Sequence, residues 1–217
     1  MKKQIEIVVP TDYSAIPLKK YLKIQKDFDM NEEDENVQNA YLLYNFCGIT
    51  PQMAVQLDSS TLNSVLLDLK KLLSKTDYEL QRFITIDNVE YGFEPNLSKI
   101  PYGAYLDLSS YQTIALDDNW QKIMTILYRP VTKKRGVLYE IEPYKGFSKK
   151  DTQKWLEVSM DFHFGVFFYF LNLYKVSLNA TLNSMKNHPE ISPNIKSVLE
   201  KSGELIQLLH NSQEKIF

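Results

Sequence analysis

The chain of 217 residues is poor in the residue types on which many enzymes and metalloproteins depend, with one Cys, three His and seven Gly. A single cysteine excludes an intramolecular disulfide and any metal cluster built from several cysteines. No two histidines have the i, i+4 spacing that places two metal ligands on one helical face. No glycine-rich phosphate-binding motif and no G-x-S-x-G elbow occurs. These absences exclude several classes of metalloprotein and enzyme, and they indicate no particular cofactor.

Strong net charge and long hydrophobic runs are also lacking. The formal net charge is −2, which excludes a nucleic-acid binder that works through overall positive charge. The most apolar stretch, 162–173, takes in Asp161 and Lys175 once it is widened to the ~20 residues that a membrane span requires. We therefore predict a buried helix, or a helix covered by a partner subunit. Ile5, Ile7 and Val9 alternate with polar residues, which predicts a strand ended by Pro10 and no secretion signal.

Capping residues mark several helices in the first 75 residues. Helices are predicted over 16–28 and from about Glu32 to Cys47, with Gly48 as the residue that ends the second one. Thr50-Pro51 opens a short helix, and Asp58 opens another. Apolar residues expected to point inward are Val37, Ala40, Tyr41, Leu43 and Tyr44 on the second helix, and Leu62, Val65, Leu66, Leu69, Leu72 and Leu73 on the last.

Short strands are predicted in the middle of the chain. Segments 80–86 and 89–93 flank Asp87-Asn88, two residues that tolerate positive φ, which indicates a tight hairpin. A short helix near Tyr105 follows, and a helix opened by 117–119 ends at Pro130. Beyond it we expect a basic loop over 132–136, a strand over 137–141, and helices over 149–158, 161–178, 179–186 and 193–211.

The predicted fold is therefore mostly α in an α+β chain, with a β-hairpin and a few short strands. No linker, repeat or low-complexity segment appears, so a single domain over 1–217 is expected. Within it we predict a helical N-terminal lobe (1–78), a hairpin with a short helix (79–115) and a helical C-terminal lobe (116–217).

Candidates for catalysis are few. Cys47 has no nearby base in the sequence and is interpreted as a packing thiol. His163 lies among aromatic residues and is interpreted as a core histidine. The acidic run 31–36 lacks the glycine and final glutamate of an EF-hand and is interpreted as a helix start. An enzyme remains an alternative if Asp161, His163 and Cys47 converge in one pocket.

Candidates for contact with a partner are aromatic and basic. The first group is Phe162, Phe167, Tyr169 and Phe170, which pack either in a core or against a partner. The second group is Lys133, Lys134 and Arg135, interpreted as a solvated loop tip or as a contact with an acidic partner. No metal, cofactor, small-molecule substrate or nucleic acid is expected.

One stretch carries a resemblance. It contains Ile86-Asp87-Asn88 with Tyr91, then Gly103 to Leu108, then Leu127-Tyr128-Arg129-Pro130, and finally Gly165-Val166-Phe167-Phe168. In this order the motifs, which span about 84–172, resemble small tail-assembly and virion structural proteins of bacteriophages, including crAss-like phages of Bacteroidetes. Asn88 stands where glycine is common in the hairpin. The motifs are structural, so the resemblance carries over no catalytic residue.

The resemblance implies a non-enzymatic bacteriophage morphogenesis protein. Such a protein either stays in the virion as a tail or neck component or acts as a tail-assembly chaperone in the host cytoplasm. Its partners would be other phage structural proteins of the tail, the neck or the region near the portal, and copies of itself in a homo-oligomer. A bacterial adaptor that binds a partner through its aromatic helix is the other alternative to the enzyme.

Overall fold

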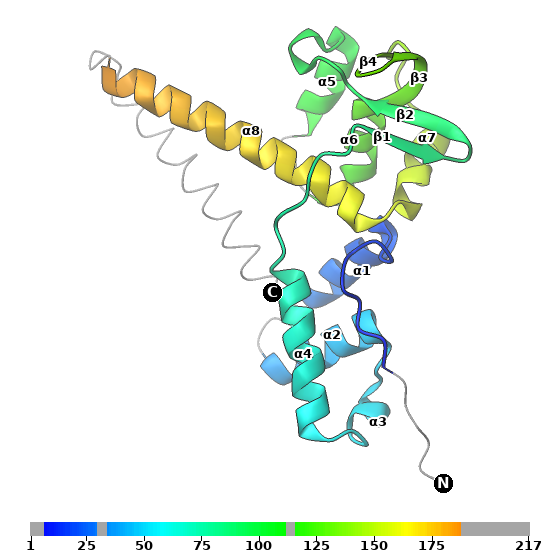
Figure 1. Ribbon diagram of the computed structural model, residues 1–217, viewed down its shortest axis with the longest axis vertical. Helices are drawn as coiled ribbons and strands as arrows, with labels where there is room; N and C mark the ends of the chain where they lie inside the picture. The colour runs from blue at the N-terminus through cyan, green and yellow to red at the C-terminus, as the bar shows by residue number, and fades with distance from the viewer. Residues whose placement is uncertain (1–6, 30–33, 112–115, 188–217) are drawn as a thin grey trace. The chain divides into compact units, whose positions relative to one another are not determined.

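Residues 7–29, 34–111 and 116–187 are described by a computed structural model of the chain (Figure 1). They form a mostly helical α+β fold with an antiparallel sheet, so the predicted fold class is confirmed. The chain divides into two compact units, and each is discontinuous in sequence. The first unit is drawn from 1–12, 24–77 and 169–217, and the second from 13–23 and 78–168.

Two helices contribute residues to both units. They are α1 (Leu18–Asp29) and α8 (Met160–Asn187). The predicted helices over 161–178 and 179–186 are one continuous helix, α8. The predicted helix over 193–211 lies outside the described residues. Among the described residues, no helix is both long enough and apolar enough to cross a bilayer.

The first unit contains a group of capped helices, α2 (Glu35–Cys47), α3 (Pro51–Ala54) and α4 (Ser59–Leu73). The side chains of Asp34, Thr50 and Asp58 accept main-chain N–H bonds at the three helix starts. Gly48 ends α2 with a φ of 69°, a left-handed conformation that glycine adopts without strain. The predicted caps at positions 48, 50 and 58 are confirmed.

Helices α2 and α4 bury different parts of their predicted apolar faces. On α4 the expected stripe is buried at Val65, Leu69, Leu72 and Leu73. On α2 the buried residues are Leu42, Leu43 and Phe46. The prediction that Val37, Ala40 and Tyr44 point inward is wrong, because all three are exposed and α2 packs through the face that carries Leu43 and Phe46. Val37 and Tyr44 are 42% and 54% exposed.

The second unit holds the sheet, in which the described strands follow the order β1-β2-β3-β4 and every neighbouring pair is antiparallel. Asp87 and Asn88 join the first two strands with φ values of 51° and 62°, the tight turn that the sequence predicts. The strands are β1 (Phe83–Ile86), β2 (Val89–Phe93), β3 (Tyr128–Arg135) and β4 (Leu138–Ile141).

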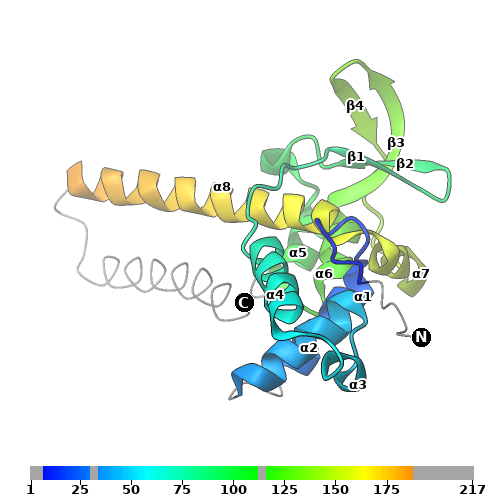
Figure 2. The ribbon, with the colours of Figure 1, turned by 60° about the horizontal axis from the view of Figure 1, so that its bottom comes forward.

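Strand β3 was not predicted. Helix α6 (Trp120–Leu127) ends three residues before the expected stop at Pro130, and the chain continues directly as β3. The prediction of a basic loop over 132–136 is wrong, because 132–135 belong to β3, where 133–135 pair with β4. Within this segment only Gly136, with a φ of 59°, is in the turn. An irregularity in the pairing lies between Val131 and Lys133, and beyond it β3 and β4 project as a two-stranded ribbon (Figure 2).

The core of the second unit is aromatic. Trp120 and Trp155 are fully buried, and Tyr128 lies between Trp155 and Phe162 at ring-centroid distances of 5.5 and 5.2 Å. The remaining helical segments around this core are η1 (Leu97–Lys99), α5 (Tyr102–Ser110), α7 (Lys149–Gln153) and η2 (Lys154–Glu157). The predicted inward positions of α6, namely Trp120, Ile123, Met124 and Leu127, are all buried.

Main-chain hydrogen bonds join the segment before α1 to the start of α8. Pro17 forms an antiparallel bridge with Ser159. The N–H of Leu18 donates to the carbonyl of Val158 at 3.0 Å, and the N–H of Met160 donates to that of Ile16 at 2.8 Å. The predicted strand over 5–9 does not form in its described part, because residues 7–9 have no ladder partner.

Gly165 allows the main chain at Glu79 to approach α8 closely. A Cβ atom at Gly165 would overlap the carbonyl oxygen of Glu79 and lie 3.1 Å from its carbon. The absence of a side chain at Gly165 therefore lets another main-chain segment reach the aromatic helix.

Candidate functional site

The aromatic contact candidates on α8 divide into core and partly exposed residues. Phe162 and Phe167 are only 3% and 7% exposed, so they pack in the core of the second unit and present almost no surface to a partner. Tyr169 and Phe170 are half-buried, and their rings contact each other edge to face at 5.4 Å. The aromatic run is therefore built first for packing.

The basic contact candidates lie on strand β3, where acidic neighbours neutralise two of them. Lys133 pairs with Glu140 across the ladder at 3.1 Å. Lys134 pairs with Glu90 at 2.6 Å and lies 3.7 Å from the centroid of the Phe83 ring. The side chain of Arg135 is exposed, and it makes no ion pair or hydrogen bond with any described residue. One unpaired cation is a weak basis for recognising an acidic surface.

His163 is a core residue with both ring nitrogens in use. The indole N–H of Trp120 donates to Nδ1 at 3.1 Å, and Nε2 lies 3.0 Å from the carbonyl oxygen of Trp155. Because an indole can only donate, Nδ1 is the acceptor and Nε2 carries the proton. The ring is thus neutral and fully buried, which leaves no nitrogen to act as a base toward a substrate.

The neutral state of His163 makes the stability of the second unit depend on pH. Burial lowers the pKa of His163 to about 4 from its ordinary value of 6.5. Stability is complete above pH 6.5 and falls as the pH drops toward 4, because the unfolded chain takes up the proton first. We expect a loss of about 2 kcal/mol near pH 4.5 relative to pH 7.

The measurement is urea unfolding between pH 7 and 4.5, comparing the wild type with His163→Gln, whose amide can also accept and donate. The variant is expected to lose less stability on acidification. Equal pH profiles would show that His163 carries no such linkage.

The other catalytic candidates, Asp161 and Cys47, lie in different units. Asp161 lies in the first turn of α8, where a carboxylate favours the helix dipole. Cys47 is the last residue of α2 in the first unit, and it is partly buried. No group of three or more His, Cys, Asp or Glu side chains in the described part of the chain is arranged to hold a metal ion.

A buried ion pair connects β2 to β3. The guanidinium of Arg129 donates to the carboxylate of Glu94, and both side chains are less than 10% exposed. Arg129 itself lies in β3. Its Nε and Nη1 are buried without a hydrogen-bond partner. Tyr144, whose ring lies 5.9 Å from the guanidinium, donates its hydroxyl to Asp107, and burial raises its pKa.

An exposed apolar face on α5 was not singled out from the sequence. Tyr102, Tyr105 and Leu106 are 74%, 55% and 48% exposed. Their i, i+3, i+4 spacing places them on one side of the helix, which we call the α5 face. The only buried residue of α5 is Ala104, so the helix packs through a small residue and turns its large ones outward. The i, i+3, i+4 spacing of these three residues is the pattern in the sequence from which the α5 face could have been predicted.

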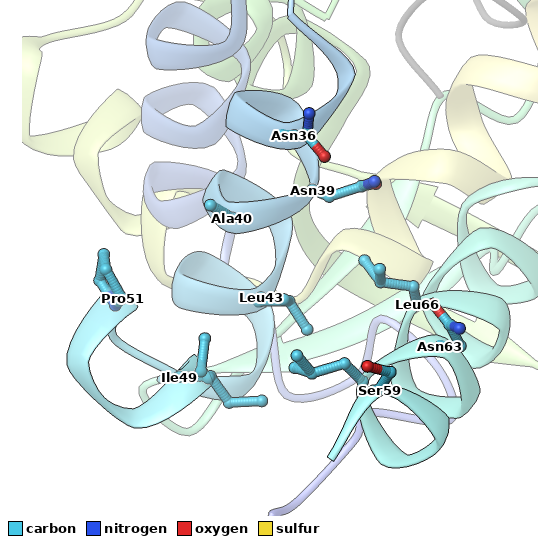
Figure 3. A pocket seen from close by; sticks show the side chains of 11 residues that line it. Asn36, Asn39, Ala40, Leu43, Ile49, Pro51, Ser59, Asn63 and Leu66 are labelled. Carbon is cyan, nitrogen blue, oxygen red and sulfur yellow. The ribbon is translucent and has the colours of Figure 1, made fainter. Parts of the chain in front are cut away.

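A pocket with a volume of about 330 Å³ lies between α2, α3 and α4 in the first unit (Figure 3). We call it the α2–α4 pocket. Seven apolar and four uncharged polar residues line it: Ala40, Leu43, Ile49, Pro51, Ala54, Leu62 and Leu66, with Asn36, Asn39, Ser59 and Asn63. The volume is at the lower end of the range of ~300–1,000 Å³ that is typical of ligand pockets.

Comparisons with protein-family models, with curated proteins and with solved structures give no significant match to this chain.

Proposed function

We propose that this protein is a non-enzymatic bacteriophage morphogenesis protein that acts through protein–protein contacts. The observation that carries the proposal is the ordered set of motifs over 84–172, which resembles phage tail-assembly and virion proteins. These motifs belong to the second unit up to Phe168, and several have a structural task there. Asp87-Asn88 forms the hairpin turn, Tyr128 fills the core and Gly165 admits a neighbouring backbone.

The placement of reactive, charged and apolar side chains also favours a function in protein–protein contact. His163 is enclosed by the core, and the lysines of β3 are paired with acids. What the second unit presents to solvent includes the α5 face and the tip of the β3–β4 ribbon, where Val137 and Leu138 are 89% and 74% exposed. Tyrosine is one of the side chains enriched among the residues that contribute most to binding at protein interfaces. We propose the α5 face as the contact surface for a tail, neck or portal-proximal protein.

The test is mass spectrometry of purified phage particles and of the lysate from which they are taken. A tail or neck component is expected in the particles at a fixed ratio to the other structural proteins. A tail-assembly chaperone is expected only in the lysate, bound to a tail protein. Absence from particles and from complexes with phage structural proteins would reject both forms of the proposal.

A substitution in the α5 face tests the surface itself. Tyr105→Asp is expected to abolish co-purification with the partner while leaving the melting temperature nearly unchanged, because Tyr105 is already half exposed. Val55→Asp is the matched control, since Val55 is 83% exposed and lies in the first unit. Equal association of the two variants would show that the α5 face is not the contact surface.

A further inference from the structure

The α2–α4 pocket is built for an uncharged ligand. Charged residues make up 24% of the chain, yet none of the residues that line the pocket is charged. A charged group placed there would give up its hydration without meeting an opposite charge, which is costly. Its floor includes Leu43 and Ile49, which are 5% and 1% exposed, and such a surface favours an aliphatic group.

The polar part of the pocket suits a peptide main chain. The side-chain amides of Asn36, Asn39 and Asn63 make no hydrogen bond to any described residue. Figure 3 shows Asn39 and Leu43 on the same helix, with Asn63 and Leu66 on the helix opposite, so that each wall offers at least one amide and one leucine. Each amide provides two donors and one acceptor, the groups that an unpaired peptide N–H and C=O require.

The conformation of the ligand follows from the same groups. A helix satisfies its own main-chain N–H and C=O groups and has none to offer to an amide in its middle. An extended segment has both groups free on each residue. We propose that the α2–α4 pocket binds an extended, uncharged segment of a partner protein, with one aliphatic side chain in the pocket and its main chain held by Asn39 and Asn63.

Because the ligand is taken to be a protein, the site rests on the proposed contact function. The two are tested separately, since the α5 face can bind its partner whether or not the α2–α4 pocket is used. An experiment with purified full-length protein and synthetic peptides can therefore fail without affecting the result with phage particles.

The probe is the capped peptide acetyl-Ser-Thr-Leu-Thr-Ser-amide, titrated to millimolar concentration into the ¹⁵N-labelled protein. We expect main-chain amide shifts concentrated on α2, α3 and α4. Replacing the central Leu by Asp or Lys is expected to weaken binding by about tenfold or more, since a charge has no partner in the pocket. Methylating the main-chain nitrogens on either side of Leu is expected to weaken it as well. Absence of shifts, or equal binding of the charged peptides, would overturn the proposal.

Variants of the protein locate the site. Ala40→Phe places a large side chain in the pocket and is expected to weaken binding of the Leu peptide by about tenfold or more. Ala180→Phe is its matched control, because Ala180 is exposed on α8 and does not line the pocket. Asn63→Leu removes one side-chain amide and keeps a side chain of similar size. It is the second pocket variant, used if Ala40→Phe fails to fold. Unchanged binding in both pocket variants would show that the peptide binds elsewhere and overturn the assignment.

Discussion

Replacing Glu94 by Gln is expected to lower the free energy of unfolding of the second unit by about 3–5 kcal/mol. The substitution keeps the shape of the side chain and removes the charge that faces Arg129. The guanidinium is then left in the core without its counter-charge, and two of its nitrogens already lack a hydrogen-bond partner. A buried, uncompensated charge is among the most destabilising changes a single substitution can make.

A matched control is available in strand β2, which Glu94 directly follows. Glu90→Gln breaks the ion pair with Lys134, which is 38–39% exposed, and is expected to cost less than about 1 kcal/mol. Urea unfolding followed by tryptophan fluorescence reports on the second unit, which contains Trp120 and Trp155. The double variant Glu94→Leu with Arg129→Met is expected to recover most of the loss, because it leaves no charge behind. If Glu94→Gln and Glu90→Gln lose the same stability, the Arg129 pair is not a buried charge.

Gly165→Ala is expected to cost about 3 kcal/mol or more, at the upper end of the effect of overpacking. The added methyl group would overlap the carbonyl oxygen of Glu79, and main-chain atoms cannot rotate away as the end of a flexible side chain can. Alanine is intrinsically the better helix former, so the steric effect outweighs a gain of about 1 kcal/mol.

Gly103→Ala measures the gain in helix propensity without the steric overlap. Gly103 also lies in a helix, and a Cβ atom there would meet the Tyr144 ring at 3.6 Å, an ordinary van der Waals distance. We expect Gly103→Ala to be neutral or stabilising by less than about 1 kcal/mol in thermal unfolding. A Gly165→Ala variant as stable as Gly103→Ala would contradict the close approach of Glu79 to α8.

Features that depend on neighbouring residues were predictable from the sequence. The caps at Asp58 and Thr50 and the helix end at Gly48 each rest on a side chain or a φ value within three residues of the element they terminate. The Asp87-Asn88 turn is predictable for the same reason, because few residues tolerate two successive positive φ values.

Features that depend on residues distant in the chain were missed. Strand β3 contains Pro130 and a row of basic residues, which read locally as a helix stop and a loop. Its pairing with β2, 35 or more positions earlier, makes it a strand: Gly92 opposes Arg129 and Tyr91 opposes Pro130. The Arg129–Glu94 pair depends on that same register. The α2–α4 pocket was missed because helical periodicity tells which face of a helix is apolar and not how closely two such faces meet.

The bridge between Pro17 and Ser159 has a consequence for synthesis on the ribosome. The main-chain partners of residues 13–18 lie at 158–160 and are made more than a hundred residues later. At about 5–20 residues per second the interval is roughly 7–30 s. Throughout that time the buried side chains of Tyr13, Ile16 and Leu18 lack their native surroundings. The second unit is therefore completed only when the start of α8 has been made.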